Sequence, residues 1–286
     1  IVTENNSPQI PRKIWFLWLQ GYDDMPEVVR KSYDSWRKYN GSWEIIFLDT
    51  HNFDRFVDLG KVLENRGSEI PRVTMSELIR INLMAQHGGV WVDATCFCCK
   101  PLDDWLLDHL QTGCFAFDRP GTDRMLSSWF LASEPGSYIA QTYARAATAF
   151  WETHKDLVFV SKRRLWHRLI NRSGLYSRLK ADPPRWFSSP FTRWLKVYPY
   201  YWFHYTFEKV YREDATFREH WDRTPKISAD SPHRLWNQGL ATPISAEVKK
   251  EVDQRSDPLY KLTWTVNDDM FSPGSGLEYL LYHSGL

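Results

Sequence analysis

The chain has 286 residues and a formal net charge of +1, which suits one elaborated domain and argues against a general polyanion binder. Residues 161–196 hold ten Lys or Arg against one acid, so the remainder carries 26 basic and 34 acidic residues. No run of 18 apolar residues is present, and we expect no membrane-spanning helix. Residues 1–9 are polar and lack the regions of a signal peptide, so we expect a cytoplasmic protein with reduced thiols.

Apolar runs and amphipathic stretches alternate along the first 100 residues. In chain order we expect strands at residues 11–21, 43–48 and 89–93, and helices at residues 26–39, 53–65 and 76–87. This order predicts an α/β fold with a mostly parallel central sheet.

The remainder of the chain continues with mixed elements. Cys96 and Cys99 are spaced like half a zinc site, but the run 96–99 is more typical of a buried strand because no matching pair follows. Further strands are expected at residues 114–117, 127–132 and 258–264, helices at 136–154 and 198–211, and a terminal helix.

Polar side chains gather where the helix at 76–87 leads into the strand at 89–93. Ser76, Glu77, Arg80 and His87 fall within one arc of the helix, and the strand ends at Asp93. In α/β proteins, the carboxyl end of a buried strand is where ligand-binding groups lie. A Glu and an Arg one turn apart provide hydrogen-bond acceptors and a fork of donors, although such a pair can also be an ordinary surface ion pair.

Several short motifs together resemble a known family. They are Pro11-Arg12-Lys13-Ile14-Trp15 with Trp18 and Gln20, Ser76-Glu77-x-x-Arg80, Gly88-Gly89-Val90-Trp91-Val92-Asp93, Pro101-Leu102-Asp103 and Tyr260-Lys261-Leu262-Thr263-Trp264. Their order and spacing resemble the capsular polysaccharide synthesis family, which is related to DXD-type mannosyl and galactosyl transferases and distantly to the large clostridial glucosylating toxins.

The resemblance implies a bacterial glycosyltransferase with a GT-A-like fold that moves a hexose-type sugar from a nucleotide donor, most simply a UDP-sugar, to a surface or capsular glycan. It also implies retention of the anomeric configuration. On this basis we divide the chain into a nucleotide-sugar-binding core at residues 1–154, a basic and aromatic helical insertion at 155–225, and a segment at 226–286 that completes the donor cleft.

The resemblance also assigns roles to individual residues. Trp18 and Gln20 would lie against the base, Trp91 beside the sugar, and Asp93 at the ribose or a metal. Glu77 and Arg80 would bind sugar hydroxyls, with Arg80 also near the diphosphate. The implied catalytic residues are Glu77, Arg80, Asp93 and Lys261; the implied donor-binding residues are Trp18, Gln20, Ser76, Arg80, Trp91, Asp93, Thr95 and Trp264.

One departure from the family pattern concerns the metal. The second carboxylate of the DXD pattern is replaced by Thr95, and Lys261 stands where the toxin relatives supply a further acid. Mn²⁺ or Mg²⁺ at Asp93 is therefore one expectation, since these ions prefer anionic oxygens. The other is that Lys261, with Arg80 and Lys13, neutralises the leaving diphosphate in place of a metal.

The basic segment offers a further interaction surface. Its Lys and Arg residues interleave with aromatic ones: Trp166, Trp186, Phe187, Phe191, Trp194, Tyr198 and Trp202. Residues 161–203 could thus contact the inner face of an anionic membrane, an anionic glycan or single-stranded nucleic acid, or form a helical face with buried aromatics. We favour the membrane, where lipid-linked acceptors are found. A binding module and an inactive transferase relative are the alternative functions.

Overall fold

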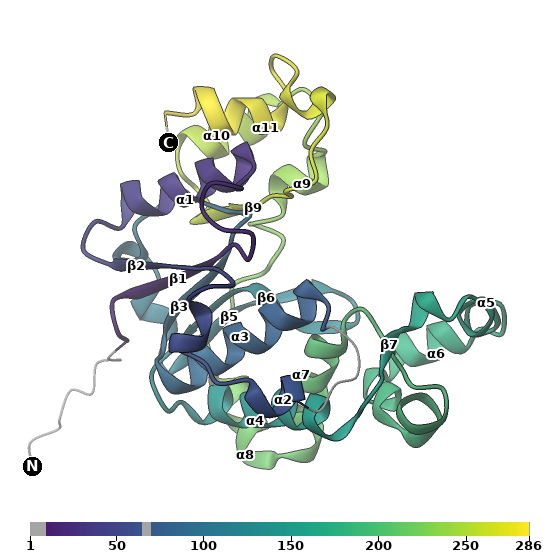
Figure 1. Ribbon diagram of the computed structural model, residues 1–286. Coiled ribbons are helices and arrows are strands. Elements are labelled where there is room, and N and C mark those ends of the chain that lie inside the picture. The colour runs from purple at the N-terminus through teal and green to yellow at the C-terminus, as the bar shows by residue number, and fades with distance from the viewer. Residues whose placement is uncertain (1–9, 65–69, 286) are drawn as a thin grey trace, which may run out of the picture.

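The computed structural model describes residues 10–64 and 70–285 (Figure 1). The polar residues 1–9 and the last residue of the helix expected at 53–65 lie outside the described residues.

A five-stranded sheet forms the centre of the molecule, in the order β2-β1-β3-β6-β5. Strand β1 pairs in parallel with β2 and β3, whereas β6 is antiparallel to both β3 and β5. Four of the five strands therefore run in one direction, which confirms the predicted α/β fold with a mostly parallel sheet. The strands are β1 (Lys13–Leu17), β2 (Glu44–Leu48), β3 (Gly89–Asp93), β5 (Cys114–Gly121) and β6 (Arg124–Ser133).

Helices cover both faces of this sheet because its central strands are apolar on both sides. Trp15 and Trp91 face the layer that contains α3 and α4, and Phe16 and Val90 face the layer that contains α1. The core helices are α1 (Glu27–Tyr39), η1 (Phe53–Arg55), α2 (Gly60–Glu64), α3 (Arg72–Gln86), η2 (Leu102–Asp104), η3 (Leu107–His109) and α4 (Tyr138–Thr153).

The segment after α4 divides into two parts. Helices α5 and α6 project away from the sheet and share a small core with η5 and β8, whereas α7 and α8 pack back against α4 (Figure 1). The predicted domain boundaries near residues 154 and 225 stay predictions. The elements are β7 (Val158–Phe159), η4 (Val160–Lys162), α5 (Arg164–Arg172), α6 (Leu175–Ala181), η5 (Pro183–Phe187), η6 (Pro190–Trp194), β8 (Val197–Tyr198), α7 (Trp202–Glu213) and α8 (Ala215–Arg223).

The last segment returns to the sheet and packs beside α1 (Figure 1). Its strand β9 pairs antiparallel with β4, with Cys96 opposite Lys261, and the predicted buried strand at residues 96–99 is thereby confirmed. The remaining elements are β4 (Cys96–Cys98), α9 (Arg234–Gln238), α10 (Ala246–Asp253), β9 (Leu259–Lys261), η7 (Asp268–Phe271), α11 (Gly276–Glu278) and η8 (Tyr279–His283).

Candidate functional site

The turn between α3 and β3 determines where the predicted polar groups lie. Gly88 and Gly89 have φ values of +63° and +91°, which residues with a Cβ rarely adopt. A Cβ on Gly88 would lie 2.6 Å from the carbonyl oxygen of Ser133, so the chain approaches β6 closely at this point. The turn therefore lets α3 lie on the sheet while β3 runs to the carboxyl edge, where it ends at Asp93.

Asp93 forms an ion pair with α3 in which the arginine is buried and the carboxylate is partly exposed. Arg80 Nη2 lies 2.9 Å from Asp93 Oδ1, and the indole N–H of Trp91 donates to the same oxygen at 2.9 Å. Arg80 also donates to the carbonyl of Ser128 at 2.7 Å and to the hydroxyl of Ser76 at 3.2 Å. The guanidinium is thus held by three elements, and it fixes the carboxylate at the end of β3.

Lys261 reaches the same carboxylate from the end of the chain. The pairing of β4 with β9 places it beside Thr95, whose hydroxyl accepts a hydrogen bond from Lys261 Nζ. The ammonium also lies 3.8 Å from Asp93 Oδ2. Asp93 is therefore flanked by two cations and remains about a quarter exposed, so a ligand can reach this cationic group of side chains.

Glu77 lies behind this group and is buried. Burial raises the pKa of its carboxyl to about 8, although the positive charge of Arg80 opposes the shift. The carboxyl therefore carries a proton through most of the neutral range. Since Glu77 and Arg80 are each 5 % exposed, neither offers much surface to a ligand in this structure.

The side chains at Asp93 do not fit a divalent cation. Both carboxylate oxygens face cations, and the hydroxyl of Thr95 is engaged by Lys261. Within residues 10–64 and 70–285, no three His, Cys, Asp or Glu side chains come together as a metal-binding group. One carboxylate between an arginine and a lysine is a poor ligand set for Mn²⁺ or Mg²⁺, which prefer several anionic oxygens.

Two tryptophans mark the outer side of the site, of which Trp18 is partly buried and Trp264 is exposed. The rings of Trp18 and Trp264 meet edge to face with their centroids 6.2 Å apart, and Trp264 is 57 % exposed. Gln20 follows Trp18 on the surface. Trp91 is instead buried under Arg80, whose guanidinium carbon lies 5.0 Å from the ring centroid. The structure thus leaves Trp264 and part of Trp18 open to a ligand and covers Trp91.

Two residues grouped with the site by sequence lie elsewhere. Lys13 is the first residue of β1, whereas Leu17, the last residue of that strand, lies beside Asp93. The expectation that Lys13 joins Lys261 and Arg80 is wrong, because the two ends of a strand reach opposite edges of a sheet. His87 shares a helix face with Arg80, but it lies at the far end of α3, where it hydrogen bonds to the carbonyl of Phe56.

Other residues at the site had no sequence signal of their own. Tyr200 precedes α7 and is 55 % exposed. Partial burial of its hydroxyl, together with the negative charges of Glu77 and Asp93, raises the pKa of that hydroxyl. His204 is buried on α7; burial lowers its pKa to about 3, helped by the positive charges of Arg124 and Arg80. The packing of α7 against the sheet brings Tyr200 near Glu77 and Asp93, and His204 near Arg80.

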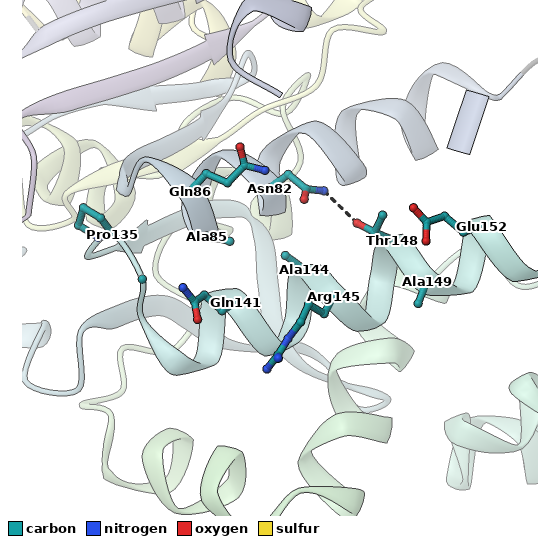
Figure 2. Close-up of a pocket in the computed structure, with 11 residues that line it drawn as sticks. Asn82, Ala85, Gln86, Pro135, Gln141, Ala144, Arg145, Thr148, Ala149 and Glu152 are labelled. Carbon is teal, nitrogen blue, oxygen red and sulfur yellow. Dashed lines mark hydrogen bonds between the residues drawn. The ribbon is translucent and has the colours of Figure 1, made fainter. Parts of the chain in front are cut away.

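A separate hollow of about 920 Å³ lies between α3 and α4 (Figure 2). Its walls combine apolar and polar surface, and Asn82 donates a hydrogen bond to Thr148 across it at 3.1 Å. None of the predicted site residues lines it. We therefore place the candidate site where the charged groups converge at Asp93 and not at this hollow.

Comparisons with known proteins identify the family of this chain. The family described as capsular polysaccharide synthesis protein matches residues 2–160, more than half of the chain, and the chain belongs to that family. O-glycosyltransferase braB of Annulohypoxylon truncatum is 24 % identical over 160 residues, which cover 49 % of this chain and 38 % of the relative. An uncharacterized glycosyltransferase, L373, of Acanthamoeba polyphaga mimivirus is 27 % identical over 100 residues, or 34 % of this chain and 40 % of the relative.

The chain thus spans about two fifths of the length of these curated relatives. Among solved structures, the PaToxG glycosyltransferase is similar at 12 % identity and a TM-score of 0.36, over 50 % of this chain and 62 % of that one.

Proposed function

We propose that this chain is a glycosyltransferase that uses a nucleotide-sugar donor and a glycan acceptor. The observation that supports this most is the cationic group at the carboxyl edge of the sheet, where Arg80 and Lys261 flank the partly exposed Asp93. Such a group suits a polyhydroxyl ligand that carries a diphosphate. The curated relatives are named glycosyltransferases, which supports the same class.

In this proposal the donor lies across the ends of β1 and β3 in a GT-A-like arrangement. The base packs on Trp18 and Trp264 near Gln20, and the diphosphate lies beside Lys261 and Thr95. Asp93 binds a ribose or sugar hydroxyl. The burial of Glu77, Arg80 and Trp91 suits positioning residues that hold Asp93 better than direct donor contacts.

Substitution at the ion pair tests the assignment. We expect Asp93→Asn and Arg80→Ala to reduce UDP release from a panel of UDP-sugars by at least about 10²-fold, because the carboxylate loses its charge or its position. Arg145→Ala is the matched control, since Arg145 is exposed and bonds only to Thr142 among the described residues. Near-normal turnover in a folded Asp93→Asn protein would refute the proposal, and circular dichroism reports whether each variant is folded.

We further propose that Lys261 supplies the positive charge that a metal supplies in DXD-type enzymes. The ammonium stabilises the negative charge that develops on the leaving diphosphate. We expect turnover to be the same in EDTA and in added Mn²⁺, and Lys261→Ala to lose about 10²-fold while Lys249→Ala on α10 does not. Loss of turnover in EDTA that Mn²⁺ restores would contradict this.

The stereochemistry and the sugar are finer parts of the same proposal. We propose retention, with a UDP-linked hexose as donor and same-face attack in which the leaving phosphate oxygen accepts the acceptor's proton. Proton NMR of the first product formed shows the anomeric configuration directly. An inverted product would contradict this part alone.

Peripheral membrane association through residues 161–203 is a second proposal, with the inner face of the cytoplasmic membrane as the site. Helix α5 exposes Leu165, Trp166 and Leu169 beside its arginines, and Trp194 on η6 is 79 % exposed. Exposed rings interleaved with cations suit the headgroup region of an anionic bilayer. Among the helices that the structure describes, none has the length and apolar character to cross a bilayer.

Vesicle sedimentation tests the membrane proposal. We expect the protein to sediment with vesicles that contain phosphatidylserine and not with pure phosphatidylcholine. The double substitution of Trp166 and Trp194 by Ala should abolish this, whereas Trp236→Ala, at an exposed tryptophan on α9, should not. Equal sedimentation of both variants would contradict the proposal. Salt-sensitive binding of single-stranded nucleic acid, with no binding to vesicles, would favour the nucleic-acid alternative.

A further inference from the structure

A third cation faces the candidate site from the hairpin of β5 and β6. Arg124 begins β6, and its side chain is 19 % exposed. Its Nε lies 3.4 Å from a carboxylate oxygen of Asp123, and the other oxygen of Asp123 accepts a hydrogen bond from Tyr205 at 2.5 Å. Because Tyr205 belongs to α7, the guanidinium is held between the sheet and that helix.

Aromatic surface lies directly against this guanidinium. Its central carbon is 4.1 Å from the ring centroid of Tyr201, and the ring of Tyr200 meets that of Tyr201 edge to face at 5.0 Å. A Cβ on Gly121 would overlap Arg124 Nη2, so the glycine leaves the space that the guanidinium occupies. The result is a cation against the ring of Tyr201, with the ring of Tyr200, which is more than half exposed, next to Tyr201.

The strand order places Arg124 on the far side of Asp93 from the tryptophans. Trp18 follows β1, which pairs with one edge of β3, and β6 pairs with the other edge. Arg80 connects the two regions, since it contacts both Asp93 and the carbonyl of Ser128 on β6. If the base of the donor lies at Trp18 and its diphosphate lies at Lys261, the region beside Arg124 stays free for the acceptor.

Electrostatics agree with this placement. Burial lowers the pKa of His233, and the positive charges of Lys261 and Arg124 lower it further. The positive charges of both cations therefore act on His233. In the part of the chain that the structure describes, Arg124 donates one hydrogen bond, from Nη2 to the carbonyl of Pro120 at 3.2 Å, and its Nε is buried beside Asp123. No described residue accepts a hydrogen bond from Nη1, so this group can donate to a ligand.

We propose that Arg124, Tyr200 and Tyr201 form the acceptor subsite, and that the acceptor carries an anionic group, a carboxylate or a phosphate, beside the transferred position. A guanidinium recognises either anion through paired hydrogen bonds, and tyrosine rings provide the flat apolar surface against which a sugar ring packs. The interpretation of this subsite as an acceptor site rests on the proposed transferase function.

Binding of small sugars tests the subsite independently of turnover. The probes are methyl β-glucuronide, glucose 1-phosphate and the neutral methyl β-glucoside, each titrated by saturation-transfer NMR in the presence of UDP. We expect one or both acidic probes to bind at least about tenfold more tightly than the neutral probe. The stronger of the two shows whether carboxylate or phosphate is preferred.

Variants on the hairpin complete the experiment. Arg124→Ala should remove the preference for the acidic probe, and Gly121→Ala should weaken it by displacing the guanidinium without removing its charge. Arg119→Ala is the matched control, because Arg119 is on the same hairpin and its side chain is 72 % exposed. Equal binding of acidic and neutral probes, no binding of any probe, or a preference that survives Arg124→Ala would overturn the inference.

Donor hydrolysis separates this inference from the proposed function. Arg124→Ala should leave the KM for UDP-sugar hydrolysis unchanged, and a rise in that KM would mean that Arg124 binds the donor and not the acceptor. If the wild-type chain hydrolyses no UDP-sugar, the proposed function fails, while the NMR titrations still decide whether an anion subsite exists.

Discussion

The protonated state of Glu77 has a measurable effect on folding. Burial raises the pKa of this carboxyl from 4.5 to about 8. Between these values the unfolded chain has lost the proton while the folded chain keeps it, so the free energy of unfolding falls as pH rises. Over the whole interval of about 3.5 pH units the loss is about 5 kcal/mol. Glu77→Gln preserves the shape and removes this dependence.

His204 has the opposite effect over part of the range. Its pKa is lowered from 6.5 to about 3, so below pH 6.5 unfolding takes up a proton and stability falls as pH falls. The two slopes therefore oppose each other between pH 4.5 and 6.5. Of these two groups only Glu77 acts from pH 6.5 to 8, where its contribution amounts to about 2 kcal/mol.

Urea denaturation at fixed pH measures this difference. We expect the wild-type free energy of unfolding to fall by about 2 kcal/mol between pH 6.5 and 8, and that of Glu77→Gln to stay level. Glu219→Gln is the control, since the Glu219 side chain is 70 % exposed, and it should follow the wild type. If Glu77→Gln and the wild type lose stability in parallel over this interval, the carboxyl is not held protonated by burial and the reasoning is refuted.

Three further outcomes follow from the same structure. Gly88→Ala should lower the free energy of unfolding by about 1–3 kcal/mol, because φ is +63° and the Cβ would meet backbone atoms of β6; an unchanged melting temperature would contradict this. The four cysteines are buried with raised thiol pKa values, so Ellman's reagent should react only after unfolding. Trp91→Phe should lower kcat by about tenfold in a folded protein, because Asp93 loses the 2.9 Å indole donor; full activity would remove Trp91 from the positioning residues.

The sequence predicted the layers of the fold because the apolar patterns are strong. Runs such as residues 11–21 and 89–93 are apolar on both faces, as expected of central strands that helices cover on both sides. The shared face of Glu77 and Arg80 also followed from helical spacing. The predicted ends of the helices and strands were less accurate. The helix predicted at residues 198–211 begins at Trp202, because residues 197–198 form a strand that pairs with β7.

Burial at the site was not predictable from the same patterns. Glu77 and Trp91 were expected to touch a ligand, but α7 packs over this region and its Phe203 lies 5.9 Å from the Arg80 guanidinium carbon. Helix α7 lies more than 100 residues further along the chain, and its docking depends on tertiary packing that local sequence patterns do not indicate. For the same reason Trp186 and Phe191 proved to be buried within the appendage, while Trp166 and Trp194 are exposed.

Contacts between distant segments were predicted only through the family resemblance. Lys261 and Thr95 are 166 residues apart, and nothing in either local sequence indicates that they meet. Arg124 had no motif at all, because its position depends on the β5–β6 hairpin and on α7 together.

Because β4 pairs with β9, the site is completed late in the synthesis and folding of the chain. Asp93 and Arg80 come from neighbouring elements, so their ion pair needs only the early α/β unit. Lys261 joins them only after the intervening residues have been synthesised and the long loop has closed, which is entropically costly and slow. A nascent or truncated chain that lacks β9 would present the carboxylate without its second cation, so donor turnover should begin only when the last segment has docked.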